Sequence, residues 1–358
     1  MPAITGMKGA GFYDLHSGPQ MSTIRALQSW IDDAVSSLPL PASSQPVTIL
    51  DLGSSEGGNA IRQMAAIVAG LRRRTGQPLQ TVYSDLASNN FNQLFANLHA
   101  ARRTGALHEQ VYPSAVGGSF YEPLLVPGTV HFAVSFNSVQ WLDRLPDVLL
   151  PSMIAYRRPS PLRPNLVVSP EVMEAFTRQA EQDLVRFLER RALELVPGGK
   201  LLLAAPGDSN EASVCDGLAD VLNDACLDLV ITGQLKQAEY ERIRMPCYWR
   251  NVEEMLAPLE RQGSPVRGAF TVERSEALEV PPPFIVEFRR SGDAATYAGA
   301  YSGFIRAVTE PVVRGALNRP NESTTVEGLY ERVRARLLAE PERYVFRYIL
   351  VAVLLTRR

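Results

Sequence analysis

The sequence predicts an α/β protein built on a doubly wound, mostly parallel sheet. Short apolar segments that end at turn residues alternate with longer segments whose apolar residues recur every three or four positions. Strands separated by helices in this way are typical of a sheet with crossover helices. The chain has 358 residues, of which 46% are hydrophobic, enough for a large core. We expect one chain-spanning unit with helical insertions late in the sequence.

In the first half of the chain, the elements are arranged around one glycine-rich turn. Apolar and β-branched residues lead into Asp51, and the turn follows in the segment VTILDLGSSEGGN. The periodicities predict, in order, a helix over 22–38, a strand from residue 47 to 51, a helix over 61–74, a short strand over 81–84, a helix over 91–98 and a strand over 130–136.

The second half of the chain is mainly helical in pattern. Residues 151–172 are rich in proline and lack clear periodicity, and the most regular helical pattern spans 173–195 before Pro197. The patterns that follow predict a strand over 200–205, helices over 206–256, short strands over 267–272 and 285–288, helices over 294–340 interrupted near 318–323, and a terminal strand over 344–356.

The composition excludes several classes of function. The formal net charge is −2, without the positive excess of a nucleic-acid-binding protein. No apolar run approaches the roughly 20 residues of a membrane helix, and residues 1–20 lack the apolar segment of a signal peptide. The three cysteines and four histidines show no metal-site spacing, so we expect no metal site. The low cysteine content favours a cytoplasmic location.

Asp51 and Asp85 each end a predicted strand, with one helix between them. The carboxyl ends of consecutive strands lie side by side in such sheets, where ligands bind. Asp85 is placed to accept hydrogen bonds from two ribose hydroxyls. The turn differs from the G-x-G-x-x-G of dinucleotide-binding loops, and the acid at Asp51 disfavours a pyrophosphate. The pattern therefore favours S-adenosylmethionine (SAM), which carries a sulfonium and an ammonium, over NAD. A capped turn beside a solvated acid is the purely structural alternative.

Seven segments resemble the SABATH family of SAM-dependent carboxyl methyltransferases. Their order and spacing agree with that family over most of the chain. The segments are MKGAGFYDLHSGPQ (7–20), ILDLGSSEGGN (49–59), SDLASNNFNQLF (84–95), GGSFYEPLLVPGTVHFAVSFNSVQWL (117–142), VPGGKLLL (196–203), RMPCYW (244–249) and FIRAVTEPV (304–312).

The resemblance implies a Rossmann-like methyltransferase core with a helical cap over the active site, and it leaves a homodimer open. We expect the SAM-binding core in residues 40–205, 265–290 and 343–358. We expect the cap and substrate-binding insertions in 151–172, 206–256 and 291–340, with residues 1–20 closing over the site.

The resemblance also implies a role for individual residues. Ser17 and Asp51 would hold the methionine end of SAM, and Phe120 would stack on the adenine. Gln20 and Trp141 would donate hydrogen bonds to the two oxygens of an acceptor carboxylate. The implied SAM-binding residues are Tyr13, Ser17, Asp51, Gly53, Asn59, Asp85, Leu86, Ser119 and Phe120.

A carboxylate acceptor makes physical sense of this pair. Carboxyl groups have an ordinary pKa near 4, so the acceptor is already ionised at neutral pH and no general base is needed. A side-chain amide and an indole N–H are neutral donors that can fix the carboxylate. Their contribution would be positioning and desolvation rather than proton transfer. The products would be a methyl ester and S-adenosylhomocysteine (SAH).

Two positions of the expected acceptor pocket depart from the family pattern. Asn137 stands where the family usually has tyrosine, and Gln140 where it often has histidine. With Tyr248 and Trp249, these residues are expected to line the acceptor pocket. Such a polar wall favours a small aromatic or terpenoid-like acid other than plain benzoate or salicylate. Methylation of a phenolic oxygen or ring nitrogen and a non-catalytic SAM-fold binding protein remain alternatives. Trp141 and Phe120 also fit a purely structural role in the core.

Overall fold

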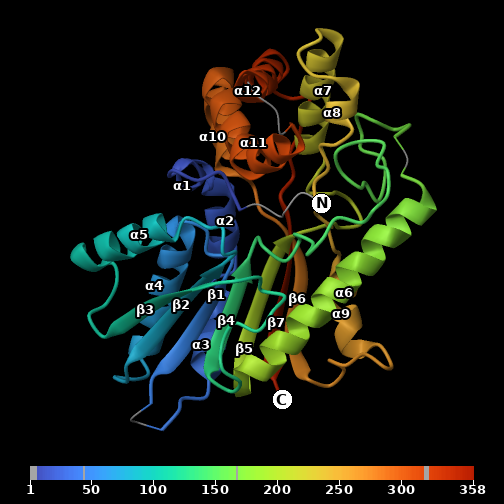
Figure 1. Ribbon diagram of the computed structural model, residues 1–358. Coiled ribbons are helices and arrows are strands. Elements are labelled where there is room, and N and C mark those ends of the chain that lie inside the picture. Colours follow the sequence, from blue (N-terminus) through green and yellow to red (C-terminus); the bar gives the residue numbers. More distant parts are fainter. Residues whose placement is uncertain (1–5, 43–44, 167, 318–321) are drawn as a thin grey trace.

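The computed structural model describes the chain except residues 1–5, 43–44, 167 and 318–321 (Figure 1). The strands of the described part form one seven-stranded sheet in the order β3-β2-β1-β4-β5-β7-β6. β7 runs antiparallel to both of its neighbours, and the other pairs are parallel. The strands are β1 Val47–Leu52, β2 Leu79–Asp85, β3 Val111–Gly117, β4 Val130–Phe136, β5 Leu195–Pro206, β6 Phe270–Glu279 and β7 Ile349–Arg357.

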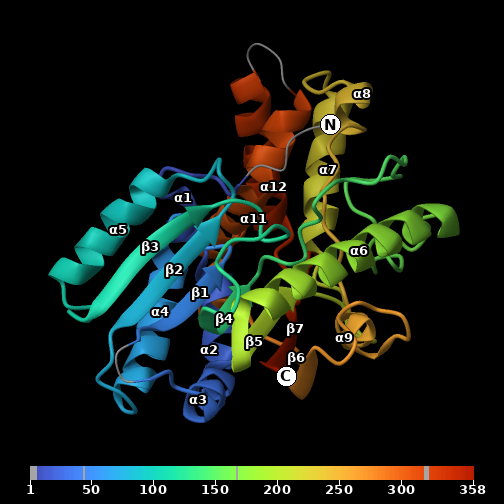
Figure 2. The same ribbon diagram turned by 60° about the horizontal axis from the view of Figure 1, so that its bottom comes forward.

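Helices cover both faces of this sheet. β1 illustrates why, because Ile49 packs into one hydrophobic cluster and Leu50 into the other, as the alternation of side chains along a strand requires. Helices α3 (Gln28–Ser37), α4 (Gly58–Arg72) and α5 (Phe91–Arg103) belong to the first face. Helices α6 (Pro170–Glu194) and α9 (Val252–Glu260) cover the second face, as Figure 2 shows.

Five further helices in the described part of the chain gather beyond one end of the sheet, and we call this group the cap. Both views place it in the upper part of the picture, and Figure 1 shows it next to α1 and α2. An aromatic cluster joins the cap to the segment that leads into β7, with Phe284 stacked on Tyr301 at 4.8 Å and Tyr301 on Phe346 at 5.7 Å between ring centroids. The cap helices are α7 Leu218–Ile231, α8 Gln237–Tyr240, α10 Pro283–Ser291, α11 Ala294–Leu317 and α12 Glu322–Ala339, whereas α1 is Phe12–His16 and α2 is Gly18–Ala26.

The strand predicted over 285–288 is wrong, because these residues belong to α10. Prolines at the start of this helix supply the fixed φ that suits its first turn. Phe284 and Ile285 are buried while Val286 is 52% exposed, so one face of the helix packs against its neighbours. A short apolar run with β-branched residues fits a strand or a helix equally well. The segment 265–290 therefore divides between β6 of the sheet and α10 of the cap.

Other predicted elements also differ in detail. The single helix expected over 22–38 is divided between α2 and α3, at the fully buried Leu27. β3 was not predicted, because it is an edge strand with Pro113 inside it and its Tyr112 exposed. The described residues of 151–169 form turns rather than helices, and α9 packs on the sheet rather than in the cap. The predicted interruption near 318–323 lies mostly outside the described residues.

Candidate active site

The strand order reverses between β1 and β4, where doubly wound sheets bind their ligands. A cavity of about 280 Å³ lies there, and we call it the donor cavity. Eight residues predicted to bind SAM or the acceptor line it. They are Tyr13, Gly53, Asp85, Leu86, Ser119, Phe120, Asn137 and Trp141.

Asp51 lies at the end of β1 and lines a small cavity that adjoins the donor cavity, together with Gln20 and Asn59. Its side chain is buried, and Oδ2 has no hydrogen-bond partner among the described residues. Burial, and then the charge of Asp85, raise the pKa of Asp51 to about 8. A buried carboxylate without a partner is unfavourable, so this position fits a cationic group of a ligand, as SAM provides.

Asp85 ends β2 and is held by two backbone amides. Leu86 N–H donates to Oδ1 at 2.8 Å, and Ser55 N–H donates to Oδ2 at 2.7 Å. Burial raises the pKa of Asp85, and these two hydrogen bonds oppose that shift. Each carboxylate oxygen keeps further acceptor capacity, so the oriented side chain can still accept hydrogen bonds from a ligand.

Gly53 follows β1 and allows the turn to pass close to the loop after β4. Its φ is +96°, and a Cβ atom there would lie 2.0 Å from Ser138 Oγ. The Gly53 N–H donates to Ser84 O at 2.9 Å, which ties the turn to β2. Glycine is required here both by its backbone conformation and by this close approach.

The hydroxyl of Ser17, which is predicted to help hold SAM, makes its hydrogen bond within its own turn. Its Oγ donates to Asp14 O at 3.3 Å, and within the described part of the chain it lines none of the cavities described here. Its carbonyl accepts a hydrogen bond from Asn59 Nδ2 at 3.2 Å. Ser17 therefore positions Asn59, because the turn between α1 and α2 directs the serine side chain back to the first helix.

A second cavity, of about 80 Å³, lies between the sheet and the cap, and we call it the acceptor cavity. Met7, Tyr13, Asn137 and Trp141 line both this cavity and the donor cavity. Gln20 lines the acceptor cavity and the small cavity around Asp51. Trp141 thus lies where the acceptor cavity meets the donor cavity, and Gln20 lies where the acceptor cavity meets the small cavity around Asp51.

The wall of the acceptor cavity is mostly apolar and comes from distant parts of the chain. Sequence reasoning missed these residues, because their periodicity indicates only that they are buried. They include Met7, Ile154, Val214, Leu218, Leu222, Met245, Phe304, Val308 and Phe346.

The first described residues close one side of both cavities. Lys8 Nζ lies 2.5 Å from Glu310 Oε2 on α11, which ties this segment to the cap. The backbone N–H groups of Ala10 and Gly11 each donate to Glu56 at 2.9 Å, which ties it to the turn after β1. The segment therefore bridges the core and the cap.

Asn137 lies at the end of β4 with φ at +57°. Its Oδ1 accepts a hydrogen bond from Tyr348 O–H at 2.8 Å, and its Nδ2 donates to Thr23 Oγ1 at 3.1 Å. Both ends of the amide are thus engaged within the protein. Gln140 differs, because its Nε2 donates to Asn137 O at 2.7 Å but its Oε1 has no partner among the described residues.

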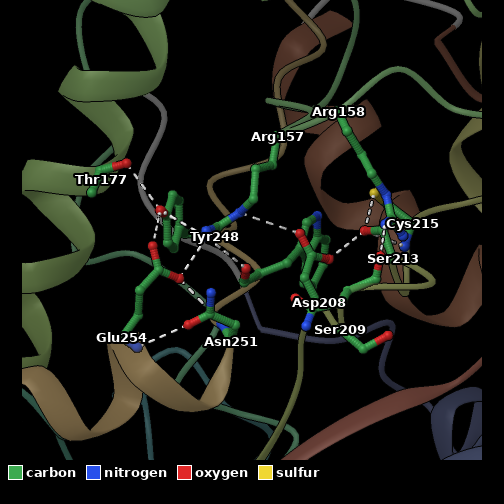
Figure 3. A network of polar contacts seen from close by, with 12 residues as sticks. Arg157, Arg158, Thr177, Asp208, Ser209, Ser213, Cys215, Tyr248, Asn251 and Glu254 are labelled. Atoms are coloured by element: carbon green, nitrogen blue, oxygen red, sulfur yellow. Dashed lines mark hydrogen bonds and ion pairs between the residues drawn. The ribbon is translucent and has the colours of Figure 1, made fainter.

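Tyr248 does not line the acceptor cavity, contrary to expectation, whereas Trp249 does. A bridge between Trp141 and Cys247 aligns the two segments, and side chains alternate along such an extended chain. Tyr248 therefore packs on the other side, where its hydroxyl donates to Glu254 Oε1 at 2.7 Å and accepts from Arg157 Nη2 at 2.9 Å. Figure 3 shows this network, which continues from Arg157 to Asp208.

The described residues contain neither a metal-binding cluster nor a membrane-spanning helix. No group of three or more His, Cys, Asp or Glu side chains in that part of the chain is arranged to hold a metal ion. Nor does any helix there combine the length and the apolar character needed to cross a membrane.

Comparison with known proteins agrees with this geometry. A family model described as SAM dependent carboxyl methyltransferase matches residues 3–358. The chain is 26% identical over 325 residues to gibberellic acid methyltransferase 2 of Arabidopsis thaliana, covering 84% of this chain and 81% of that protein. It is 30% identical over 292 residues to probable jasmonic acid carboxyl methyltransferase 2 of Theobroma cacao, covering 76% and 75%.

A solved structure of loganic acid methyltransferase with SAH has the same fold, with a TM-score of 0.78, 23% identity and 98% of both chains covered. The predicted fold, the SAM cofactor and the resemblance to the SABATH family are thereby confirmed. Because the family match extends over nearly the whole sequence, this chain belongs to the family of SAM-dependent carboxyl methyltransferases.

Proposed function

We propose that this protein transfers a methyl group from SAM to the carboxylate of a small, largely apolar acid and releases its methyl ester. The observation that carries this proposal is that the acceptor cavity adjoins the donor cavity at Trp141 and the small cavity around Asp51 at Gln20. Asp85 in the donor cavity and Asp51 in the adjoining small cavity suit a cationic methyl donor, and the acceptor cavity has a mostly apolar wall. The methyl donor and an apolar acceptor would therefore meet beside the neutral side chains of Gln20 and Trp141.

On the donor side, bound SAM supplies an electrophilic methyl group on its sulfonium. Asp51 would face the positively charged methionine end, with Asn59 and Tyr13 beside it. Asp85 would accept hydrogen bonds from the ribose. Leu86, Ser119 and Phe120 line the rest of the donor cavity and would hold the adenine. The edge-on contact of Phe120 with Tyr121, at 4.7 Å between ring centroids, supports a fixed ring position.

On the acceptor side, the chemistry of the lining residues favours an acceptor that needs no base. No His, Asp, Glu or Lys is among the described residues that line the acceptor cavity. Burial raises the pKa of Cys215, Cys247 and Tyr348 above their ordinary values, so these groups stay neutral at physiological pH. A carboxylate gives up no proton in this reaction, whereas a phenol or a ring N–H would require a proton acceptor.

Two hydrogen bonds fix the backbone of Trp141. Tyr121 O–H donates to the backbone carbonyl of Trp141 at 2.6 Å, and the backbone N–H of Trp141 donates to Ser138 O at 3.0 Å. We assign the Trp141 indole N–H and the Gln20 amide to the two oxygens of the acceptor carboxylate. Their role would be to hold one oxygen in line with the methyl group and to exclude water.

The test is methyl transfer from labelled SAM to a panel of small carboxylic, phenolic and heterocyclic acceptors. We expect methyl esters from acids only. In Gln20→Leu and Trp141→Phe variants, kcat/KM for the acid should fall about 10- to 100-fold, as expected for one lost hydrogen bond to a charged group. SAH affinity measured by calorimetry should change far less.

Methylation of phenols or ring nitrogens without any ester would contradict the carboxyl assignment. SAH binding without transfer to any acceptor would instead support a non-catalytic binding protein.

We also propose that the protein is cytoplasmic and that it forms a homodimer. All three cysteines are free and buried, which supports a reducing compartment. Light scattering on the purified chain tests the assembly, because a dimer would give twice the chain mass at all working concentrations.

A further inference from the structure

We infer that the acceptor is a hydroxy acid whose hydroxyl group binds between Gln140 and Trp249. This inference rests on the proposed carboxyl methylation and specifies its substrate class. Both residues line the acceptor cavity, and each has one buried polar atom without a partner in the described part of the chain. The two atoms are Gln140 Oε1, an acceptor, and Trp249 Nε1, a donor.

The orientation of the Gln140 amide is fixed by its neighbour. Its Nε2 donates to the carbonyl of Asn137 at 2.7 Å, and a carbonyl oxygen can only accept. The oxygen of the amide is therefore the atom left unpaired, and the residue itself is only 6% exposed. Gln140 therefore has an unpaired hydrogen-bond acceptor, Oε1, whereas its amide nitrogen already donates to Asn137.

Hydrogen bonds to backbone carbonyls hold the chain in place at both residues. Arg250 is buried and donates to Val139 O at 2.6 Å, next to Gln140. Gln140 O itself accepts from Tyr248 N–H at 2.9 Å. Arg157 Nη2 donates to Trp249 O at 3.3 Å.

A hydroxyl group matches this pair of atoms. It can donate its proton to Gln140 Oε1 and accept from Trp249 Nε1–H through a lone pair. An ether or a methyl group cannot do both. The other lining residues are mostly apolar, so the skeleton between the carboxylate and the hydroxyl would be hydrocarbon. Gln20 Oε1 is also unpaired within the described residues, but it lies at the junction with the Asp51 cavity, where the carboxylate is expected.

The experiment compares matched acids that differ by one hydroxyl. The probes are cyclohexanecarboxylic acid and phenylacetic acid, each with its 3-hydroxy and 4-hydroxy derivatives. With the wild-type protein we expect kcat/KM for at least one hydroxy isomer to exceed that of its parent acid by about tenfold or more, as in sites built to bind a hydroxyl. Calorimetry in the presence of SAH should show the same preference in binding.

Variants locate the source of that preference. Gln140→Met and Trp249→Phe nearly preserve volume, and each should bring the ratio of hydroxy to parent acid close to one. Met245→Leu changes the same wall without removing a polar atom and should keep the wild-type ratio. Trp249→Phe alone suffices if Gln140→Met fails to fold, as judged by SAH binding.

Esters formed equally well from parent and hydroxy acids would overturn the inference while leaving carboxyl methylation intact. An unchanged ratio in both variants would overturn it as well. No ester from any acid would instead contradict the proposed function itself.

Discussion

The donor cavity and the acceptor cavity share Trp141 but are built in different ways. The donor side comes mainly from the ends of β1, β2 and β4 and from the turns that follow them, and backbone hydrogen bonds hold it. The acceptor side is assembled from the start of the chain, the loop after β4 and the cap, mostly through side chains. A site held by backbone tolerates few substitutions, whereas a site held by side chains can change its specificity by single replacements.

The two sides also differ in charge. The donor side has the buried Asp51 and the half-buried Asp85, whose charge contributes to the raised pKa of Asp51. The acceptor side has no ionised side chain among its described lining residues. In the proposed function, this difference would separate the recognition of a cation from that of an apolar acid. Three substitutions test the comparison.

The largest effect is expected from Gly53→Ala. The new methyl group would meet Ser138 and require a left-handed backbone conformation for a non-glycine residue. We expect SAH affinity to fall about 100-fold or more, since strain of this kind costs about 1–3 kcal/mol before the clash is added. Calorimetric titration with SAH measures the loss. Gly76→Ala is the control, because no described atom lies within 4 Å of its Cβ position and its φ is not positive. Equal affinity in both variants would contradict the proposed close approach.

A pH-dependent effect is expected at Asp51. Its pKa of about 8 in the free protein means that the side chain is mostly protonated at pH 7. The ammonium group of SAH favours the ionised form, so SAH affinity should rise as pH increases from 6 toward 8, by up to about tenfold per pH unit. Asp51→Asn should bind more weakly and lose this pH dependence.

The same pKa shift gives a matching prediction for the free protein. A carboxyl whose pKa is raised on folding stabilises the fold most below its unfolded pKa, and this stabilisation is lost as pH rises through the folded pKa. Asp51→Asn without ligand should therefore be more stable than the wild type at pH 9, in a thermal unfolding experiment. A wild-type SAH affinity that is flat from pH 6 to 8 would contradict this account of Asp51.

The smallest effect is expected from Tyr248→Phe. Its hydroxyl joins Thr177, Arg157 and Glu254 on the side away from the acceptor cavity (Figure 3). Removing it should lower the free energy of unfolding by about 1 kcal/mol and leave the acceptor preference unchanged, as chemical denaturation and a substrate panel would show. Trp249→Phe, at the next residue along the chain, is the matched comparison, because it is expected to change the acceptor preference. A changed acceptor preference in Tyr248→Phe would place that residue back in the pocket.

Much of the donor side was predictable from local sequence. A strand, a glycine-rich turn and a helix follow from periodicity, and consecutive parallel strands bring Asp51 and Asp85 to one edge of the sheet. The same reasoning failed for residues 285–288, because Ile285 and Val286 suit a strand or a helix and only their neighbours decide. The contact that Ser17 makes within its own turn, from its hydroxyl to Asp14 O, was not predicted either.

The sequence by itself determined the fold class, the cofactor and the strand ends that would bind it, because these depend on patterns within short segments. Only the tertiary structure decided how the acceptor cavity is closed. The amide of Asn137 is satisfied by Thr23 and Tyr348, more than 100 residues away on either side, whereas Gln140 keeps one free acceptor among the described residues. Whether a polar side chain faces a ligand depends on which partners the fold brings to it, and no local pattern contains that information.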